Sequence, residues 1–212
     1  GEVTVEVYSC LPDAEKIDWT MHACGQVRHG DVASQAAIQP NKVDGLMESG
    51  TVFSREEIYD IIAQRGLAYG PMFQVLGTVH RGTDSAVADL ELPEATQQQL
   101  GDYHLHPALL DGLLQMMAAI VPPEADGGFS PFTYMPTGVK RLRILGELTD
   151  NMRVFARRTS PTEDVASPEV VMGDLSLLDA DGNVLVQVEG VRIQRVGKQT
   201  STTEIDPTQW LY

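Results

Sequence analysis

The feature that most constrains the fold is the apolar run from His106 to Val121, HPALLDGLLQMMAAIV. Pro107 stands where a helix tolerates proline, because the first helical N–H has no partner inside the helix in any case. Pro122 and Pro123 end the run. Apolar residues lie on nearly every face of the predicted helix, which is typical of a helix buried at the centre of a domain.

Two polar residues interrupt this helix, Asp111 and Gln115. They are four residues apart, so both side chains leave the helix from the same side. A buried carboxylate is costly unless it has a partner or a chemical task. Asp111 is therefore either a structural residue that reaches a partner or solvent, or a residue that lines a pocket and takes part in chemistry.

Most of the other predicted elements are strands. Alternation of polar and apolar residues predicts strands over residues 1–9, 19–32, 73–81, 85–92, 132–145, 152–158, 170–178 and 184–196. A capping box at Ser54 and Glu57 predicts a helix that ends near Gly66, and a shorter helix is expected over 94–100. The DADGN sequence between the last two strands resembles a calcium loop, but its glycine comes fourth rather than sixth, so it is predicted to be a hairpin turn.

Charge and composition exclude several classes of partner. Lys and Arg number 15 and Asp and Glu 30, a formal net charge of −15, which argues against binding to nucleic acid or an anionic membrane. No apolar run is long enough to span a bilayer and no signal-peptide core is present at the start, so we expect a cytoplasmic location. The two cysteines fit a reducing compartment. The histidines and cysteines lack the spacing of a metal site, and no glycine-rich phosphate loop follows a strand.

Two motifs resemble those of a known family, the dehydratase domains of polyketide synthases. HPALLDGLLQ is similar to the family's HPxxLDxxxQ motif, and YGPMFQ, from Tyr69 to Gln74, is similar to its YGPxFQ motif. The resemblance covers residues 1–196 and implies an α+β hot-dog fold, an antiparallel sheet wrapped around a central helix. The family's domains are two fused halves, so an incomplete double hot dog is expected here. Its parts would be trailing strands of the N-terminal half (1–32), a linker (33–51), the C-terminal half (52–196) and a tail toward the next synthase domain (197–212).

The resemblance also implies a reaction, the loss of water from a 3-hydroxyacyl thioester to give the 2,3-enoyl thioester. A base must remove the proton beside the carbonyl, and an acid must protonate the departing hydroxyl. Asp111 matches the family's acid, and burial among leucines favours its protonated form. Gln115 matches the residue that supports the Asp by hydrogen bonding. A purely structural role, as a buried amide whose hydrogen bonds are all made within the core, is an equally good interpretation.

Other residues of the two motifs receive supporting roles. Tyr69 matches a tyrosine that lies near the substrate in the family. Gly70 and Pro71 are expected to shape the turn that leads the chain past the family's narrow substrate tunnel. His106 is expected to fix the start of the central helix rather than to act in catalysis.

One part of the family's pattern is missing. The family's first half supplies a catalytic His in an HxxxGxxxxP motif, which fits none of the five histidines; after His22 the glycine comes one place early. We therefore expect the parent domain to be a hydro-lyase and this chain, alone, to be inactive. Two alternatives stay open: a non-catalytic module that binds acyl chains or scaffolds a synthase, and an isomerase or cyclase of the same fold.

Partners follow from the resemblance as well. The substrate would arrive on the phosphopantetheine arm of an acyl carrier protein, and no cofactor is expected on this domain. A docking patch is expected at Lys140, Arg141, Arg143, Arg157 and Arg158, with Arg153 nearby, unless these residues form an ordinary solvated strand face. We also expect contacts with the N-terminal half and neighbouring synthase domains, and self-association through residues 1–32. Substrate length, stereochemistry and synthase module are not fixed by the sequence.

Overall fold

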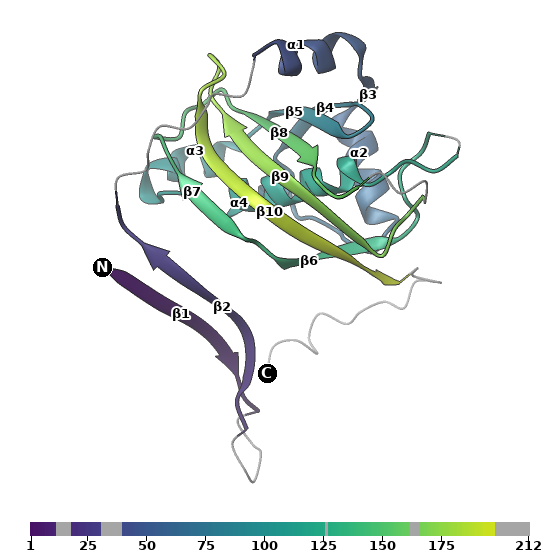
Figure 1. Ribbon diagram of the computed structural model, residues 1–212. Coiled ribbons are helices and arrows are strands. Elements are labelled where there is room, and N and C mark those ends of the chain that lie inside the picture. Colours follow the sequence, from purple (N-terminus) through teal and green to yellow (C-terminus); the bar gives the residue numbers. More distant parts are fainter. Residues whose placement is uncertain (12–17, 31–39, 126, 162–165, 198–212) are drawn as a thin grey trace. The chain divides into compact units, whose positions relative to one another are not determined.

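The computed structural model describes residues 1–11, 18–30, 40–125, 127–161 and 166–197, and it divides the chain into two units, residues 1–35 and 36–212 (Figure 1). The first unit is an antiparallel hairpin of β1 (Glu2–Ser9) and β2 (Thr20–Arg28), with a bulge between Val7 and Tyr8. Every residue of both strands is exposed. A two-stranded hairpin with neither face covered is at best marginally stable in water.

The second unit is built on one antiparallel sheet. Its strands are β3 (Thr51–Phe53), β4 (Leu76–Arg81), β5 (Ser85–Leu90), β6 (Thr133–Gly138), β7 (Arg141–Ile144), β8 (Arg153–Arg158), β9 (Val170–Leu178) and β10 (Val184–Gly197). They are ordered β3-β4-β5-β8-β9-β10-β6, and β7 also pairs with β10. The helices are α1 (Pro40–Ser49), α2 (Arg55–Ala63), α3 (Glu94–Gln99) and α4 (Pro107–Gln115), with 3₁₀ turns η1 (Pro71–Phe73), η2 (Leu100–Asp102) and η3 (Met116–Ile120).

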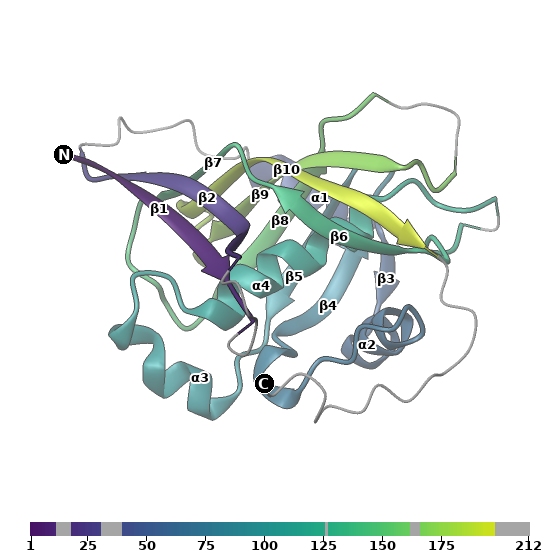
Figure 2. The same cartoon turned by 90° about the horizontal axis from the view of Figure 1, so that it is seen from below.

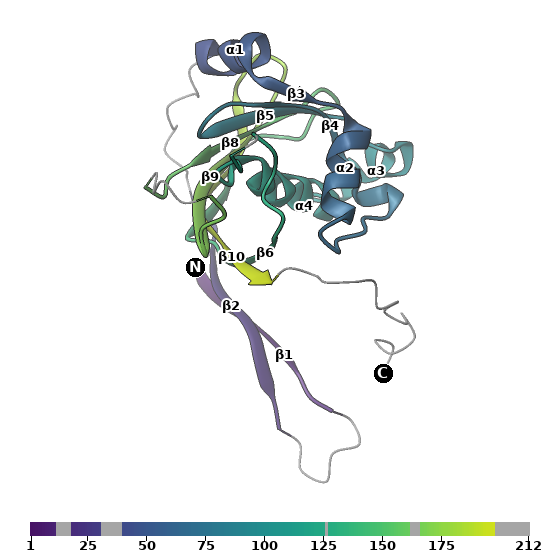
Figure 3. The same ribbon diagram turned by 90° about the vertical axis from the view of Figure 1, so that its right-hand side faces the viewer.

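Helix α4 and turn η3 lie on the concave side of this sheet, and α1 lies on the opposite side (Figures 2 and 3). Leu109, Leu113 and Met116 are fully buried there against the inner faces of the strands. Two glycines allow the close approach. A Cβ on Gly112 would clash with Cγ2 of Val75, and a Cβ on Gly173 of β9 would lie 2.5 Å from Cδ1 of Ile120. The predicted central helix surrounded by strands is therefore present.

The end of the central helix is held by two buried arginines. The helical run is α-helical as far as Gln115 and continues as the 3₁₀ turn η3. It ends at Val121, which has φ −61° and ψ 134°, because a proline disfavours helical backbone in the residue before it. Arg81 of β4 donates a hydrogen bond of 2.7 Å to the carbonyl of Val121, and Arg158 of β8 donates one of 3.3 Å to the carbonyl of Ile120. These cations satisfy carbonyls at the negative end of the helix dipole.

Several sequence-based expectations differ from the structure. The stretch expected to be a linker, 33–51, contains α1 within its described part, because Val43, Leu46 and Met47 pack on an apolar patch of the sheet's outer side. The strand expected from Phe73 begins only at Leu76, and Phe73 itself is 40% exposed in turn η1. The capping box at Ser54 and the hairpin of β9 and β10 are confirmed.

Candidate active site

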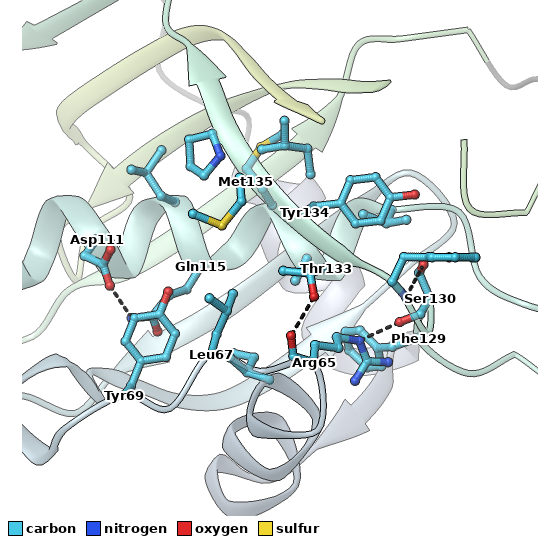
Figure 4. A pocket seen from close by; sticks show the side chains of 18 residues that line it. Arg65, Leu67, Tyr69, Asp111, Gln115, Phe129, Ser130, Thr133, Tyr134 and Met135 are labelled. Atoms are coloured by element: carbon cyan, nitrogen blue, oxygen red, sulfur yellow. Dashed lines mark hydrogen bonds between the residues drawn. The ribbon is translucent and has the colours of Figure 1, made fainter. Parts of the chain in front are cut away.

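A pocket of about 160 Å³ lies between α4, the segment after α2, and β6 (Figure 4). Its lining is mostly apolar and includes Leu67, Leu114, Met117, Phe129, Phe132 and Met135. Asp111, Gln115 and Tyr69 lie at one end of the pocket, and Arg65, Ser130, Thr133 and Tyr134 lie from its middle toward the other end. A concave apolar site with a few polar groups is the usual form of a small-molecule binding site.

Asp111 stands in the pocket wall on α4. Removal from water raises the pKa of its carboxyl group above the ordinary value, and a hydrogen bond from Gln115 partly offsets that effect. The cause is general, since burial disfavours the charged form of an acid. A carboxyl group with a raised pKa keeps its proton to higher pH and can donate it.

Gln115 connects Asp111 to two other elements. Its Nε2 donates to Oδ2 of Asp111 at 2.7 Å and to the carbonyl oxygen of Phe73 at 2.9 Å. Its Oε1 accepts a hydrogen bond of 3.0 Å from the hydroxyl of Tyr59, which itself accepts one of 2.9 Å from the N–H of Leu76. The amide is buried and its position is fixed by α2 and by the segment after Pro71.

Tyr69 lies opposite Asp111 at the same end of the pocket. Burial raises the pKa of its hydroxyl to about 12, and the nearby Asp111 charge contributes to the same shift. Its ring packs edge-on against Tyr59, with centroids 6.3 Å apart. Tyr69 therefore stays a neutral hydroxyl at any physiological pH.

Three of the predicted site residues from the two motifs lie outside the pocket lining. His106 is the N-cap of α4, where its Nδ1 accepts a hydrogen bond of 3.1 Å from the N–H of Ala108 and its Nε2 lies 3.4 Å from Oε1 of Gln99. Burial lowers the pKa of its imidazole. Gly70 and Pro71 form the exposed start of turn η1, which leads the chain past Tyr69 toward Phe73.

The sequence did not point to Tyr59 or to the far end of the pocket. Tyr59 could have been found, since it stands between Ile58 and Ile62 on the buried face of the predicted α2. At the far end, Nε of Arg65 donates a hydrogen bond of 2.5 Å to the carbonyl of Ser130, and the hydroxyl of Thr133 donates one of 2.5 Å to the carbonyl of Arg65. These contacts join residues far apart in the chain, which no local pattern shows.

The basic residues expected to form a docking patch are not gathered in one place. Arg143 of β7 pairs with Glu189, and Arg141 lies 3.9 Å from the same carboxylate. Arg157 of β8 pairs with Asp174 at 3.4 Å, and β9 and β10 separate β8 from β7. Arg158 is buried inside the sheet and cannot contact a partner. Lys140 stands beside Gly190, just before β7.

Comparison with known proteins identifies the family of this chain. Residues 39–203 match the family described as "Polyketide synthase dehydratase N-terminal domain". The chain therefore belongs to the dehydratase domains of polyketide synthases.

Relatives among curated proteins are much longer than this chain. A phenolphthiocerol/phthiocerol polyketide synthase protein of Mycobacterium tuberculosis is 26% identical over 200 residues, which are 94% of this chain and 10% of that protein. Polyketide synthase GfsB of Streptomyces halstedii is 32% identical over 162 residues, 72% of this chain and 3% of that protein. The chain thus spans only a small part of the multidomain synthases that it matches.

Solved structures confirm the predicted hot-dog fold. The dehydratase domain from the CurF module of curacin polyketide synthase superposes with a TM-score of 0.74 at 27% identity, over 92% of this chain and 65% of that one. A trans-AT dehydratase domain from Brevibacillus brevis gives 0.76 at 22% identity, over 93% and 66%. This chain covers just under two thirds of either domain.

Among the described residues, no helix is long and apolar enough to cross a membrane.

Proposed function

We propose that this chain supplies the acid-bearing part of a dehydratase that removes water from a 3-hydroxyacyl thioester to give the 2,3-enoyl thioester. One observation carries the proposal: Asp111 stands in the wall of an apolar pocket, its pKa is raised by burial, and Gln115 orients its carboxyl group. A crystal structure of the CurK dehydratase with an aspartate replaced by asparagine is described as that of an inactive mutant, which supports an essential Asp in such domains.

The proposed step uses Asp111 as a general acid. Hydroxide is a poor leaving group, so the 3-hydroxyl must receive a proton as its carbon–oxygen bond breaks. The hydrogen bond from Gln115 to Oδ2 favours Oδ1 as the atom that carries this proton. Tyr69, as a neutral hydroxyl facing the same end of the pocket, is positioned to bind the substrate.

The base in this proposal comes from outside the described pocket wall, since none of the pocket's lining residues is a histidine. His106 is occupied as a helix cap, and the sequence contains no HxxxGxxxxP motif. We assign the base to the other hot-dog half of the domain, and the hairpin of β1 and β2 to the trailing strands of that half. Residues 52–196 would then be the C-terminal half of the domain. The family model that matches residues 39–203 carries the words "N-terminal domain" in its description, so this assignment differs from that description.

The relatives suggest the partners. They are multidomain polyketide synthases, so we propose neighbouring synthase domains as partners and an acyl carrier protein as the bearer of the substrate. The phosphopantetheine arm would belong to the substrate, and the proposal needs no cofactor on this chain.

The test is a mass-spectrometric dehydration assay with 3-hydroxyacyl-pantetheine. It compares this chain, a longer chain extended upstream in the parent protein, and the Asp111→Asn variant of each. Asp60→Asn, which alters an exposed carboxyl group on α2, is the matched control. The longer chain should lose water in an Asp111-dependent way, and this chain alone should be slower by about 10² to 10⁴-fold, the usual contribution of a general base.

Other outcomes point to other functions. Full activity of this chain alone would show that the base lies within it. Binding without turnover in both chains would favour an acyl-binding module, and a product with a shifted double bond or a new ring would favour an isomerase or cyclase.

A further inference from the structure

We infer that Phe129 forms the end wall of the pocket and limits the substrate to apolar acyl chains of about eight carbons. This inference rests on the proposed function, because it places the reacting carbons beside Asp111. Figure 4 shows Asp111 and Phe129 at opposite ends of the pocket. A chain that starts at Asp111 therefore runs toward the ring of Phe129.

The ring of Phe129 is held firmly from behind. It packs edge-on against Phe53 of β3, with centroids 4.9 Å apart and the planes at 75°. The guanidinium carbon of Arg81 lies 4.4 Å from the ring centroid, and Arg81 is itself buried and bonded to the carbonyls of Val121 and Gly128. A ring with a cation on one side and an aromatic edge on another has little freedom to move aside.

The size of the pocket gives the length limit. Its volume of about 160 Å³ is close to the roughly 150 Å³ of an engineered apolar cavity that binds benzene, a molecule of six carbons. About six carbons thus fit between Asp111 and Phe129, which are carbons 3 to 8 when carbon 3 carries the reacting hydroxyl. The lining along this path is mostly apolar, with Leu114, Met117 and Phe132 among its residues. The hydroxyls of Ser130 and Thr133 at the far end are already bonded within the chain, so the accepted chain is a hydrocarbon chain.

A second, small cavity of about 10 Å³ also touches Phe129 and includes Ile58, Ile61 and Val79 in its lining. It shares Ile62, Gln115 and Ala118 with the pocket, so it lies beside the pocket. Removing the ring of Phe129 would therefore lengthen the pocket mainly by the volume of the ring itself.

The experiment measures binding rather than turnover, so it does not depend on the missing base. Amide analogues of 3-hydroxyacyl-pantetheine with four to fourteen carbons, which cannot be hydrolysed, are titrated calorimetrically into the whole chain. Each added methylene should increase the affinity about fourfold while it is buried. The increase should stop at about eight carbons.

Variants identify the wall. In Phe129→Ala, the chain length at which the affinity stops increasing, called the break below, should be longer by two or more carbons. Phe155→Ala is the matched control, because Phe155 is buried with Val87 and Leu178 in a separate cluster outside the pocket, and it should leave the break in place. If Phe129→Ala does not fold, as judged by circular dichroism, Phe129→Leu replaces it and should move the break in the same direction.

Two results would overturn the inference while the proposed function stands: an affinity that rises without a break up to fourteen carbons, or a break that stays in place in both Phe129 variants. Absence of binding at every chain length would count against the proposed function itself and, with it, against this inference.

Discussion

Nε2 of Gln115 lies 2.7 Å from Oδ2 of Asp111, and the same nitrogen lies 2.9 Å from the carbonyl oxygen of Phe73. One amide thus ties the carboxyl group on α4 to the segment that follows Pro71. The hydroxyl of Tyr59, which donates to Oε1 of Gln115, adds α2 to the same network. The orientation of Asp111 therefore depends on three elements that pack together only in the folded chain.

The raised pKa of Asp111 predicts a pH-dependent cost to stability. Below the ordinary value of 3.8 the carboxyl group is protonated in both the folded and the unfolded chain, so it contributes no difference. As the pH rises from there through the folded pKa, the unfolded chain loses its proton first and is favoured. Asp111→Asn should therefore melt at a higher temperature than the wild type at pH 7, and this difference should disappear toward pH 3.

Differential scanning calorimetry across this pH range measures the effect, with Asp60→Asn as the surface control. A variant that gains nothing at pH 7 would mean that the carboxyl group is better solvated or better bonded than its surroundings indicate.

Tyr59 should matter to stability far more than Tyr69. Tyr59→Phe removes the acceptor of the Leu76 N–H and the donor to Gln115, and a buried polar group left without a partner costs about 1–3 kcal/mol. Tyr69→Phe removes a pocket hydroxyl for which the structure gives no hydrogen bond to the described residues, so its cost should be smaller. Urea unfolding of both variants tests the ranking, and equal losses would show that the Tyr59 network adds nothing.

Arg81 is predicted to be a structural cation. Arg81→Met leaves the carbonyl of Val121 without its donor and should lower the free energy of unfolding by about 1.5–3 kcal/mol, the range for hydrogen bonds to charged groups. Arg157→Met breaks a half-exposed ion pair with Asp174 and should cost about 1 kcal/mol or less. Chemical denaturation of the two variants distinguishes these costs. An Arg81→Met variant with an unchanged free energy of unfolding would show that methionine packing replaces the cation fully.

Gly112 and Gly45 should respond in opposite ways to alanine. In Gly112→Ala the new Cβ would clash with Cγ2 of Val75, and overpacking of this kind typically costs about 1–3 kcal/mol. Gly45 in α1 has no heavy atom within 4 Å of the position that a Cβ would take, so alanine there should stabilise by about 0.5–1 kcal/mol. Val75→Ala removes the clashing Cγ2 but leaves a cavity of its own. The double variant Gly112→Ala with Val75→Ala should therefore lose less stability than the sum of the two single variants, which thermal unfolding can measure.

The sequence predicted the central helix, the strands and the polar pair on α4 because each has a local pattern. Asp111 and Gln115 are recognisable from their spacing alone, and the family motif adds their roles. Helix α1 was missed because its stretch has little periodicity, and it forms where Val43 and Met47 meet Val87 and Phe155 on the sheet. Such a contact between distant residues has no local signal.

The far end of the pocket was unpredictable for the same reason. Phe129 lies outside every predicted helix and strand, and only the fold places it against Phe53 and Arg81. The docking patch expected from the basic residues shows the opposite case, in which a local pattern does not correspond to a cluster in the fold. Its residues are close in sequence, but the order of the strands separates them and buries Arg158.

Arg81 holds both the end of the central helix and the back of Phe129. A change at Arg81 would therefore alter the pocket and the stability of the domain together, whereas a change at Phe129 alters mainly the pocket. Variation in substrate length among descendants of this chain would then arise at Phe129 and its neighbours on the pocket side. Arg81 would change less often, because any change there also lowers the stability of the domain.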